Sequence, residues 1–484
     1  MREVDFLFIH PATHCRSSDP IGRDLVTFLV MPLGTIALAD LLNRNGYSAV
    51  VYHTGIEQIQ ERGFRVEDIF KIYEPRVVGI DLHWFVHSYD AVRIAGIAKQ
   101  NSNARVVLGG FTASYFAEEI LNRFECIDMV IRGDAERPLL ELMRHLEDEE
   151  FNEVPNLVYR ENGIIKRSEN KFVAGVDDLR ELDYTSLGIL HNHERYCRLI
   201  SQSGDLDPYP WRVSVKRHTW LPLGRGCSVD CSYCGGGRKA HQLITGRAEP
   251  IFHPKQQVLE TLSKFEELGF DSVYMDFDPY PDRRYYHELF EMIRREDIDI
   301  SAQFLLWSLS DKSFIRDFRR TFNPLYSTLT VSPESGSEEV RMKNKGFYYT
   351  NDELTRWLED AKEEAIPIEV YFSTGLSWET PETFEDTIRL GEKMIERYPI
   401  ASIACNPLVL EPASPRYIAP EDFGLRIKFR SFLDYYERFR RLAIGLPAES
   451  RLGYDTEWQN EHQIIENSFR FNQMIYSTSC RESI

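Results

Sequence analysis

The sequence is poor in cysteine, in long apolar runs and in positive charge. Its 484 residues include eight cysteines, too few for a disulfide scaffold. No apolar run reaches the roughly 18 residues that cross a bilayer, and the first residues lack the apolar core of a signal peptide, so we expect a cytoplasmic protein without a membrane partner. The 57 Lys and Arg residues against 76 Asp and Glu residues give a formal net charge of -19. This charge repels phosphate backbones and argues against a nucleic-acid partner.

What remains favours a globular chain of several domains that acts on a small molecule. The length predicts two to four domains of roughly 100 to 200 residues, and the 43% hydrophobic residues can form their cores. The cysteines are unevenly distributed, because Cys227, Cys231 and Cys234 fall within eight residues. The other five are scattered: Cys15, Cys126, Cys197, Cys405 and Cys480. Cysteine chemistry is therefore expected at residues 227–234.

Residues 1–150 contain five short apolar runs separated by helical segments. The runs are rich in Val and Ile and apolar on both faces, which is typical of a parallel sheet covered by helices on both sides. They are Val4 to Ile9, Ala49 to Tyr52, Val77 to Ile80, Arg105 to Leu108 and Ile127 to Ile131. We expect an open, Rossmann-like α/β domain whose strand order cannot be read directly. No GxGxxG follows the first run, so a dinucleotide fingerprint is absent.

The segments after these runs are the candidate ligand-binding parts, since ligands of open α/β sheets bind beyond the carboxyl ends of the strands. They are residues 10–14, 81–84, 109–112 and 133–136. Gly109 and Gly110 lack a Cβ and would let a large ligand approach the backbone, although a plain strand-to-helix turn is an equal alternative. Four histidines also lie here: His10, His14, His83 and His87. They could be metal ligands, but their spacing fits no helical metal-binding pattern, so local hydrogen bonds are the favoured interpretation.

Residues 151–215 lose the repeating pattern and are predicted to be an interdomain linker. The pair Asn162-Gly163 predicts a hairpin between residues 156–159 and 164–167. A polar helical stretch from Val176 to Leu187 follows, and then a loop that contains Asp205 and Asp207.

The segment Cys227-Ser-Val-Asp-Cys231-Ser-Tyr-Cys234 is the strongest motif in the chain. A structural zinc site normally has four protein ligands, often from two CxxC pairs, and no second pair is present. Three thiolates in a CxxxCxxC loop instead suit an iron-sulfur cube in which one iron stays open to another ligand. Three unrelated buried cysteines are the structural alternative.

This motif, with an aromatic residue before its last cysteine, resembles that of the radical S-adenosylmethionine (SAM) superfamily. The resemblance implies a [4Fe-4S] cluster on Cys227, Cys231 and Cys234 whose fourth iron is chelated by SAM, and cleavage of SAM to a 5′-deoxyadenosyl radical. It places Tyr233 near the adenine, and Gly235 and Gly236 at the edge that receives the methionine end. An electron donor such as a flavodoxin or a ferredoxin is then required.

Strand and helix patterns alternate after the cysteine loop. Together with the strand that enters the loop, they give six βα-like units over residues 216–415, as in the partial barrel of that superfamily. The strands are expected at Ser272 to Phe277, Ala302 to Leu306, Ser327 to Val331, Ile368 to Phe372 and Ser402 to Val409.

Several residues after these strands resemble SAM-binding positions. Glu334 and Ser335 match a Glu-Ser pair that contacts the SAM ribose and amino group, with helix capping by Ser335 or Ser337 as the alternative. Leu408 is a candidate for apolar contact with the adenine. Asp276 and Asp278 end the second strand, near substrate or in structural hydrogen bonds.

Residues 375–380 depart from the Gly-Leu-Pro-Gly-Glu-Thr of related enzymes, since this chain has Gly-Leu-Ser-Trp-Glu-Thr. A turn is still expected there, while a contact with SAM is in doubt.

An α/β domain followed by such a barrel resembles the cobalamin-dependent branch of the superfamily, over residues 1 to about 415. The resemblance implies cobalamin contacts from Gly109, Gly110, Phe111, Thr112, Gly133 and Glu136. The DxHxxG motif that supplies a histidine to cobalt elsewhere is missing, and residues 10–14 do not match it. The cofactor is therefore expected to bind base-off without a histidine ligand, with His83 and Trp84 as candidates for its lower face.

The implied activity is methyl transfer from SAM, through methylcobalamin, to an unactivated carbon or a phosphinate phosphorus of a small molecule. A natural-product intermediate is one candidate for this substrate. A ring rearrangement or cyclisation is the alternative, with or without cobalamin, and a non-catalytic iron-sulfur redox sensor is a further one. A tRNA methylthiotransferase would need extra N-terminal cluster cysteines and a basic surface. Residues 416–484 are rich in aromatic and charged residues and predict a small, mainly helical cap, either as packing or as closure of the barrel mouth.

Overall fold

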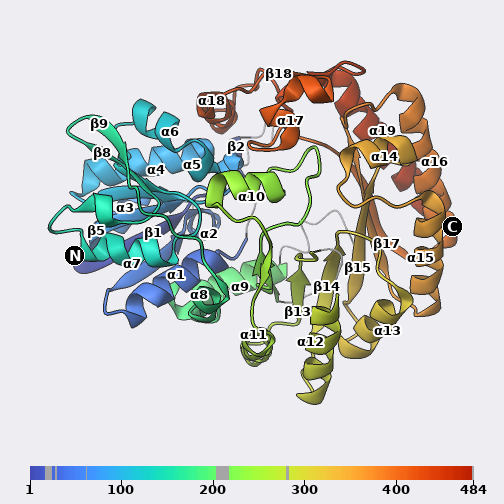
Figure 1. Cartoon of the computed structure of the whole chain (residues 1–484), viewed down its shortest axis with the longest axis horizontal. Coiled ribbons are helices and arrows are strands. Elements are labelled where there is room, and N and C mark those ends of the chain that lie inside the picture. The colour runs from blue at the N-terminus through green and yellow to red at the C-terminus, as the bar shows by residue number, and fades with distance from the viewer. Residues whose placement is uncertain (17–23, 28–29, 62, 203–216, 280–282, 482–484) are drawn as a thin grey trace. The chain divides into compact units, whose positions relative to one another are not determined.

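The computed structural model describes residues 1–484 except 17–23, 28–29, 62, 203–216, 280–282 and 482–484 (Figure 1). The loop predicted around Asp205 and Asp207 lies outside the described residues. The chain divides into two compact units. The first contains Met1–Cys197, His241–Arg247 and Phe429–Glu449, and the second contains Arg198–Ala240, Ala248–Lys428 and Ser450–Ile484.

The first unit is built on a seven-stranded sheet in the order β4-β1-β5-β6-β7-β8-β9. Its five parallel strands are β1 (Arg2–His10), β4 (Ala49–His53), β5 (Tyr73–Asp81), β6 (Arg105–Gly109) and β7 (Met129–Ile131). These are the five strands that the apolar runs predict. Their Val, Ile and Leu side chains are almost wholly buried, as expected of a sheet covered on both faces.

The order of the parallel strands has one reversal. Counted along the chain, they lie in the order 2-1-3-4-5, so that β1 has the second strand on one side and the third strand, β5, on the other. Connections therefore leave β1 and β5 toward opposite faces of the sheet, which opens a crevice between their carboxyl ends. This crevice is where an open α/β sheet binds its ligand.

The predicted hairpin forms and extends this sheet. β8 (Leu157–Glu161) pairs antiparallel with β7 and with β9 (Ile164–Arg167). The connecting residues Asn162 and Gly163 both have positive φ, of 52° and 78°, as a two-residue turn that matches the strand twist requires. Helix α8 covers only Val176–Arg180, shorter than the predicted stretch. Beyond it, the Asp183 carboxylate accepts hydrogen bonds from the backbone and hydroxyl of Thr185 and forms a turn.

Helices pack on both faces of this sheet. They include α1 (Leu33–Arg44), α2 (Thr54–Gln60), α3 (Val66–Ile72), α4 (Ser88–Asn101), α6 (Ala117–Arg123) and α7 (Glu136–Arg144). Helix α1 ends, as predicted, at Asn45-Gly46, where Gly46 has a φ of 88°.

A helix from late in the chain, α18 (Phe432–Ala443), also belongs to this unit. It packs against α4, with the rings of Tyr89 and Tyr436 5.6 Å apart. The Glu119 carboxylate of α6 accepts the backbone N–H groups of Phe432 and Leu433, at 2.9 and 3.2 Å, and so satisfies the N-terminus of α18.

The second unit is a six-stranded parallel sheet in the order β10-β13-β14-β15-β16-β17. Each strand therefore pairs with the next one of this sheet along the chain, which is the topology of a partial (β/α)₆ barrel. The strands are β10 (His218–Trp220), β13 (Ser272–Met275), β14 (Ser301–Leu306), β15 (Thr328–Glu334), β16 (Ile368–Thr374) and β17 (Ile400–Pro407). No pairing between β10 and β17 occurs among the described residues, so the barrel stays open.

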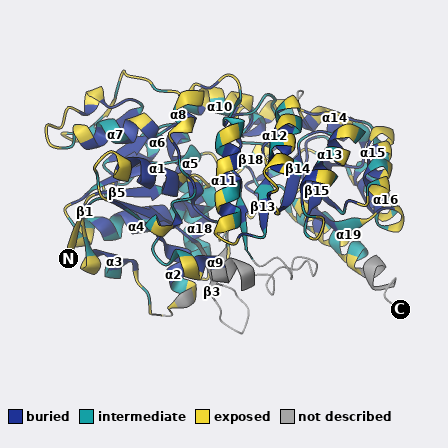
Figure 2. Ribbon diagram, turned by 90° about the horizontal axis from the view of Figure 1, so that it is seen from below, coloured by how far each residue is buried: buried dark blue, intermediate teal, exposed yellow. Residues whose placement is uncertain are grey.

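Helices follow the strands and cover the outer face of the barrel. They are α11 (Lys255–Glu267), α12 (Arg284–Arg295), α13 (Lys312–Thr321), α14 (Glu338–Asn344), α15 (Asn351–Glu363) and α16 (Pro381–Arg397). Figure 2 shows buried strands within each unit and exposed residues on the outward sides of the helices. Helix α19 (Glu461–Arg481) packs on β16 and β17, with the ring of Phe471 5.4 Å from that of Phe372. No helix in the described parts of the chain has the length and apolarity to cross a membrane.

Candidate functional site

The three cysteines lie on the loop that leaves β10. A short strand, β11 (Gly224–Arg225), pairs with β12 (Ile251–Phe252) and brings the loop out of the barrel, and α10 (Arg238–Thr245) begins after it. The three thiols are partly buried and form no disulfide. The loop turns tightly between Cys231 and Cys234, since the N–H of Cys234 donates to the carbonyl of Cys231 at 3.2 Å. The motif thus presents three thiols from one turn.

Two backbone groups donate hydrogen bonds to these sulfur atoms. The N–H of Gly236 lies 3.3 Å from the Cys234 Sγ, and the N–H of Gly346 lies 3.2 Å from the Cys231 Sγ. Burial, then the Glu411 carboxylate and the neighbouring thiols, raise the pKa of Cys234 well above its usual range. A metal bound here would replace the thiol protons, and the two N–H donors would then stabilise the resulting thiolates. These residues fit an iron-sulfur cluster.

Gly346 lies so close to the cysteine loop that there is no room for a Cβ. A Cβ built on it would lie 2.6 Å from the Cγ2 of Val229, between Cys227 and Cys231. The segment after α14 therefore rests directly on the cysteine loop.

Tyr233 and Glu334 meet beside the cysteines. The Tyr233 hydroxyl donates to the Glu334 Oε1 at 2.9 Å, the Ser373 hydroxyl donates to its Oε2 at 2.6 Å, and the Lys345 Nζ lies 3.6 Å from its Oε1. Burial alone would lower the pKa of Lys345, but the charge of Glu334, together with Tyr349 and Cys231, holds this pKa above its usual range. Glu334 is the last residue of β15, is 7% exposed and has a backbone φ of 65°.

Ser335 is fully buried next to Glu334. Its hydroxyl lies 3.4 Å from that of Thr387 in α16 and accepts the N–H of Ser337 at 3.2 Å. The helix-capping role belongs to Ser337, whose hydroxyl accepts the N–H of Val340 at the start of α14. A contact of Ser335 with SAM remains a prediction, as does the adenine contact of Leu408.

A half-buried carboxylate, Glu411, holds one glycine of the loop, and the sequence did not reveal it. The Glu411 Oε2 accepts the N–H of Gly235 at 2.7 Å. Burial raises the pKa of Glu411, while the N–H of Gly235 and the charge of Arg416 act in the opposite direction. The one available signal is a charged residue in a stretch otherwise rich in Pro and Ser.

Arg416, also missed, ties several loops together and is fully buried. Its guanidinium donates to the carbonyls of Gly375 and Val409 at 3.2 and 3.1 Å, and its backbone N–H donates to the carbonyl of Ser232 at 3.0 Å. The cysteine loop and the ends of β16 and β17 therefore share one anchor.

The turn expected at residues 375–380 is present. The Glu379 carboxylate accepts the N–H of Gly375 at 2.8 Å and closes the loop. Trp378 adopts a φ of 62°, a left-handed conformation, at the position where related sequences have their second glycine. Its ring lies 5.9 Å from that of Trp458 and 6.0 Å from that of Phe423.

The two acids that follow β13, Asp276 and Asp278, have different surroundings. Asp278 is fully buried, forms an ion pair with Arg283 at 2.6 Å, and accepts the N–H of Trp307 at 2.9 Å. It has the structural role that the sequence allowed as an alternative. Asp276 is exposed, and the Trp307 indole donates to its backbone carbonyl at 3.1 Å.

In the first unit, the predicted glycine segment lies against the segment after β5. Gly110 has a φ of 99°, and a Cβ there would lie 2.5 Å from the backbone nitrogen of His83. Thr112 donates its N–H and its hydroxyl to the His83 carbonyl, at 3.2 and 2.9 Å. The ring of Phe111 lies 5.6 Å from that of His83. These four residues therefore form one cluster at the carboxyl edge of the sheet.

The other predicted cobalamin contacts are less closely grouped. Gly133 donates its N–H to the Ser114 hydroxyl at 2.9 Å, Glu136 is buried at the start of α7, and Trp84 is 53% exposed. Their contacts with cobalamin, like those of the Gly109 to Thr112 segment, remain predictions.

A histidine cluster, His10, His53 and His87, lies at the same edge. The rings of His53 and His87 are 4.7 and 5.4 Å from that of His10. Burial, then the neighbouring imidazoles, lower the pKa of His53 well below its usual range and that of His87 to about 3. His10 hydrogen-bonds to Asp81 at 2.9 Å. His87 differs from the expected local bonding, since neither of its ring nitrogens has a partner in the described part of the chain.

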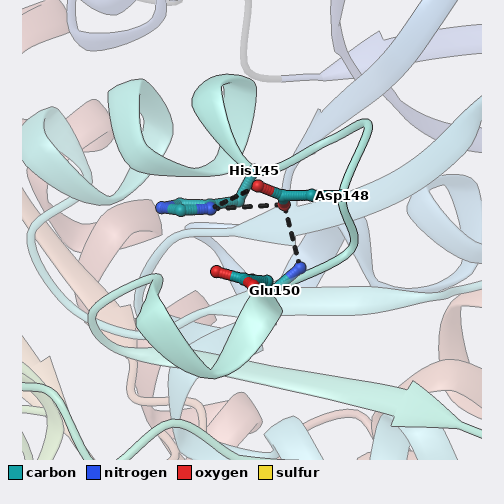
Figure 3. A group of neighbouring side chains, drawn as sticks. All are labelled: His145, Asp148 and Glu150. Atoms are coloured by element: carbon teal, nitrogen blue, oxygen red, sulfur yellow. Dashed lines mark hydrogen bonds and ion pairs between the residues drawn. The ribbon is translucent and has the colours of Figure 1, made fainter.

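One further group of metal-ligating side chains is exposed. His145, Asp148 and Glu150 follow α7 (Figure 3). Asp148 accepts hydrogen bonds from the His145 ring at 3.2 Å and from the backbone N–H of Glu150 at 3.0 Å. These bonds account for the grouping without a cation.

Comparisons with known proteins agree with both units. The family described as B12 binding domain matches residues 23–143, and the Radical SAM superfamily matches residues 221–391. The chain belongs to the cobalamin-dependent radical SAM enzymes. The predicted fold class is confirmed, and the predicted cofactor set of a [4Fe-4S] cluster, SAM and cobalamin is that of these two domain families.

Of two relatives found by sequence, one is called a cyclase and the other a methyltransferase. An anaerobic magnesium-protoporphyrin IX monomethyl ester cyclase of Rubrivivax gelatinosus is 26% identical over 402 residues, which are 80% of this chain and 65% of the cyclase. The aligned region thus spans just under two thirds of that protein. An uncharacterized methyltransferase of Pyrococcus horikoshii is 25% identical over 353 residues, 70% of this chain and 69% of that one.

Two solved structures have the same fold as this cobalamin-dependent radical SAM enzyme. The methyltransferase TsrM of Kitasatospora setae, with cobalamin and a [4Fe-4S] cluster bound, superposes with a TM-score of 0.67 at 16% identity, over 88% of this chain and 80% of TsrM. OxsB, with aqua-cobalamin and SAM bound, gives a TM-score of 0.59 at 12% identity, over 99% of this chain and 62% of OxsB.

Proposed function

We propose that this chain is a methyltransferase that moves a methyl group from SAM, by way of cobalamin, to an unactivated carbon of a small molecule. The observation that carries the proposal is the presence of both cofactor-binding units in one chain, each with its ligand-binding edge formed by the residues described above. The relatives called methyltransferases support it.

The chain's own residues would hold the cofactors as follows. When bound, the cluster and SAM supply a carbon radical, and cobalamin carries the methyl group. The thiolates of Cys227, Cys231 and Cys234 would bind three irons, and the N–H groups of Gly236 and Gly346 would stabilise the negative charge on sulfur. The fourth iron would be left for SAM.

The carboxylate of Glu334 suits the cationic end of SAM. It is charged and buried beside Tyr233, and its position at a strand end is fixed by three side chains. An ammonium group near it would gain a charge-assisted hydrogen bond in a site that excludes water. Glu411 would act through Gly235, because it holds the loop edge that faces the methionine end.

The radical reaction needs one electron from outside the chain. We propose a flavodoxin or a ferredoxin as the donor. For the organisation of the chain we propose a cobalamin-binding domain at residues 1–150, a linker at 151–215, a radical SAM domain at 216–415 and a cap at 416–484.

A cyclisation or ring rearrangement is the second candidate function, favoured by the cyclase relative that aligns over 402 residues. In that case the radical would be used without methyl transfer.

The deciding experiment uses SAM with a deuterated methyl group. Protein purified without oxygen is supplied with iron, sulfide and hydroxocobalamin, and then with labelled SAM, a reductant and candidate substrates. A deuterated methyl group in the product supports methyl transfer, whereas an unlabelled, rearranged product supports the cyclase candidate. Protein that retains no cobalamin rules out the methyltransferase and leaves the radical assignment intact.

A pair of cysteine variants tests the radical assignment alone. Cys231→Ala should form no 5′-deoxyadenosine, because the cluster loses one of three ligands. Cys126→Ala is the matched control, since this cysteine is partly buried beside the backbone of Val92 in the first unit. Undiminished 5′-deoxyadenosine from Cys231→Ala would refute the assignment.

A further inference from the structure

The six strands of the second unit's sheet carry their polar side chains on one face. In β16, the Ser373 hydroxyl reaches the Glu334 carboxylate beside the cysteine loop, whereas the ring of Phe372 packs on α19. Because side chains alternate along a strand, the Ser373 side of the sheet is the inner face of the barrel. Paired residues of parallel strands share a face, so the registers extend this inner face to the other strands. Within the regular registers its aliphatic side chains are Leu305 and Ala404 alone.

The polarity of this inner face differs from that of a filled barrel. The inside of a β/α barrel is usually packed with branched apolar side chains. Here solvent reaches the inner face, since Trp220, Tyr274 and Tyr371 are half-buried and Asn406 is exposed. A polar interior that solvent reaches is typical of a barrel that holds a ligand. The inner face is therefore a candidate surface for the substrate.

Asp276 lies at the open end of this inner face, where the strands finish. It directly follows β13, and a hydrogen bond from the side chain of Trp220, an inner-face residue, places its carboxyl group at the same face. Surrounding protein atoms raise the pKa of Asp276, and the Trp220 hydrogen bond acts in the opposite direction. Asp276 is nevertheless exposed. Its carboxyl group is thus recessed among protein atoms and still within reach of a ligand.

Two tryptophans flank Asp276. Trp220 comes from β10 and bonds to the carboxyl group, while the Trp307 indole donates to the backbone carbonyl of Asp276 at 3.1 Å. Trp307 directly follows β14, so the two indoles come from the strands on either side of β13. Both are half-buried, and the ring of Trp220 lies 5.3 Å from that of Tyr274. Aromatic rings beside a carboxylate suit a cation, which both groups attract.

The strands of the sheet favour the same charge of ligand. No Lys or Arg lies within the six strands, all of which are described. No basic side chain among the described residues shifts the pKa of Asp276. A carboxylate or a phosphate of a ligand would therefore meet no cation from the strands, whereas a protonated amine would meet a carboxylate.

We propose that the substrate carries a protonated amino group and that Asp276 binds this group beside the rings of Trp220 and Trp307. The proposal rests on the proposed function and adds to it the class of substrate, a cationic amine. It gives Asp276 the substrate-side role that the sequence left open. An ammonium group donates up to three hydrogen bonds, and a carboxylate accepts them with the assistance of charge. The rest of the substrate lies on the inner face, whose hydroxyl, amide and aromatic side chains offer hydrogen bonds and ring contacts.

Three probes that share one ring test the charge of the ligand on the full-length protein. They are the cation para-fluorophenethylamine, the neutral para-fluorophenethyl alcohol and the anion para-fluorophenylacetate. The protein is loaded with iron, sulfide and hydroxocobalamin and is given excess SAM without a reductant, so that SAM occupies its own site and is not cleaved. Fluorine NMR linewidths, measured against protein concentration, give the affinity of each probe.

We expect the amine to bind about 10-fold or more tightly than the alcohol and the acid, because it alone gains a hydrogen bond between two charged groups. Equal affinities, a preference for the acid, or no binding of any probe overturns the inference. Cobalamin retention is measured on the same samples. Protein that retains none overturns the proposed function, whereas a missing amine preference in cobalamin-loaded protein overturns the inference alone.

Variants then identify the carboxylate. Asp276→Asn should lose the amine preference and bind the alcohol as before, and it should fold because Asp276 is exposed. Asp352→Asn, an exposed change in the first turn of α15, is the matched control and should keep the preference. An Asp276→Asn protein that keeps the amine preference overturns the assignment, and so does one that keeps it and loses affinity for SAM, because Asp276 would then serve the cofactor. The comparison of the three probes needs no variant and stands if Asp276→Asn does not fold.

Discussion

The backbone N–H of Gly346 donates a hydrogen bond to the sulfur of Cys231 at 3.2 Å, across 115 residues of chain. The preceding residue, Lys345, has its ammonium group 3.6 Å from the Glu334 carboxylate. One short segment after α14 therefore contacts both the cluster loop and the carboxylate proposed to bind SAM. Changes at the cluster and at the SAM site should be coupled through it.

Gly346→Ala should lower the reduction potential of the cluster. The added Cβ would collide with Val229, 2.6 Å away, so the segment must move and its N–H must withdraw from Cys231. A lost N–H donor makes the thiolate more electron-rich and the cluster harder to reduce. The potential is measured by redox titration of the reconstituted cluster, and overpacking of this kind should also cost about 1 to 3 kcal/mol of stability.

Gly236→Ala is the control for this variant. Its Cβ would meet only the Cys234 Sγ, at an ordinary 3.8 Å, and its N–H can stay where it is. Equal potentials for the two variants would contradict the role given to the Gly346 hydrogen bond.

The pH dependence of stability should contain a contribution from Glu379. This carboxyl is fully buried, and desolvation raises its pKa to about 8, well above the ordinary value of about 4.3 for an unfolded chain. Between these two values the unfolded state is ionised while the folded state keeps its proton. Its contribution to stability is therefore present at low pH and is lost as pH rises through that window.

Glu379→Gln should remove that slope, because the amide keeps an acceptor for the Gly375 N–H and has no charge to bury. Unfolding in urea at several values between about pH 5 and pH 8 measures the difference. Glu382→Gln, an exposed change in the first turn of α16, should leave the slope as it is. A wild-type slope retained in Glu379→Gln would show that another group titrates.

The fold class could be predicted from the sequence because the buried strands are recognisable as apolar runs. Val77 to Ile80 lies in β5, and Thr328 to Val331, most of the predicted Ser327 to Val331, lies in β15. The order of the strands in the sheet could not be predicted from the sequence, since apolar runs of similar composition can pair in any order. The crevice between the carboxyl ends of β1 and β5, where His10 and Asp81 lie, follows only from the pairing of the strands.

The position of Cys227, Cys231 and Cys234 on one loop was predictable because they lie close together in the sequence with a fixed spacing. His53 was not singled out, because it ends an apolar strand and only the fold brings it 4.7 Å from the ring of His10. Glu411 lies in a loop and Arg416 in the four-residue helix α17 (Pro415–Ile418), segments too short to show periodicity, where a charge is usually solvated. Their positions beside Gly235 and Gly375 are a consequence of tertiary packing.

Asp278→Asn should destabilise the second unit, while Asp276→Asn should not. The first change leaves the Arg283 guanidinium, 12% exposed in its side chain, without its charged partner. Breaking a buried ion pair from one side costs about 3 to 5 kcal/mol. The free energy of unfolding in urea measures the loss, and equal stability of the two variants would show that the pair contributes no more than an exposed carboxylate does.

Glu334→Gln should weaken SAM binding without removing the cluster. The variant takes away the negative charge that holds Lys345 and would meet the ammonium group of SAM, and a hydrogen bond to a charged group is worth about 1.5 to 3 kcal/mol. Calorimetry on reconstituted protein should therefore show a loss in SAM affinity of about 10-fold or more. Ser373→Ala, which removes one hydrogen bond to the same carboxylate and no charge, should cost less. If Glu334→Gln binds SAM as tightly as the parent while its iron content is unchanged, the carboxylate serves Lys345 and Tyr233 alone, and the SAM ammonium must be held elsewhere.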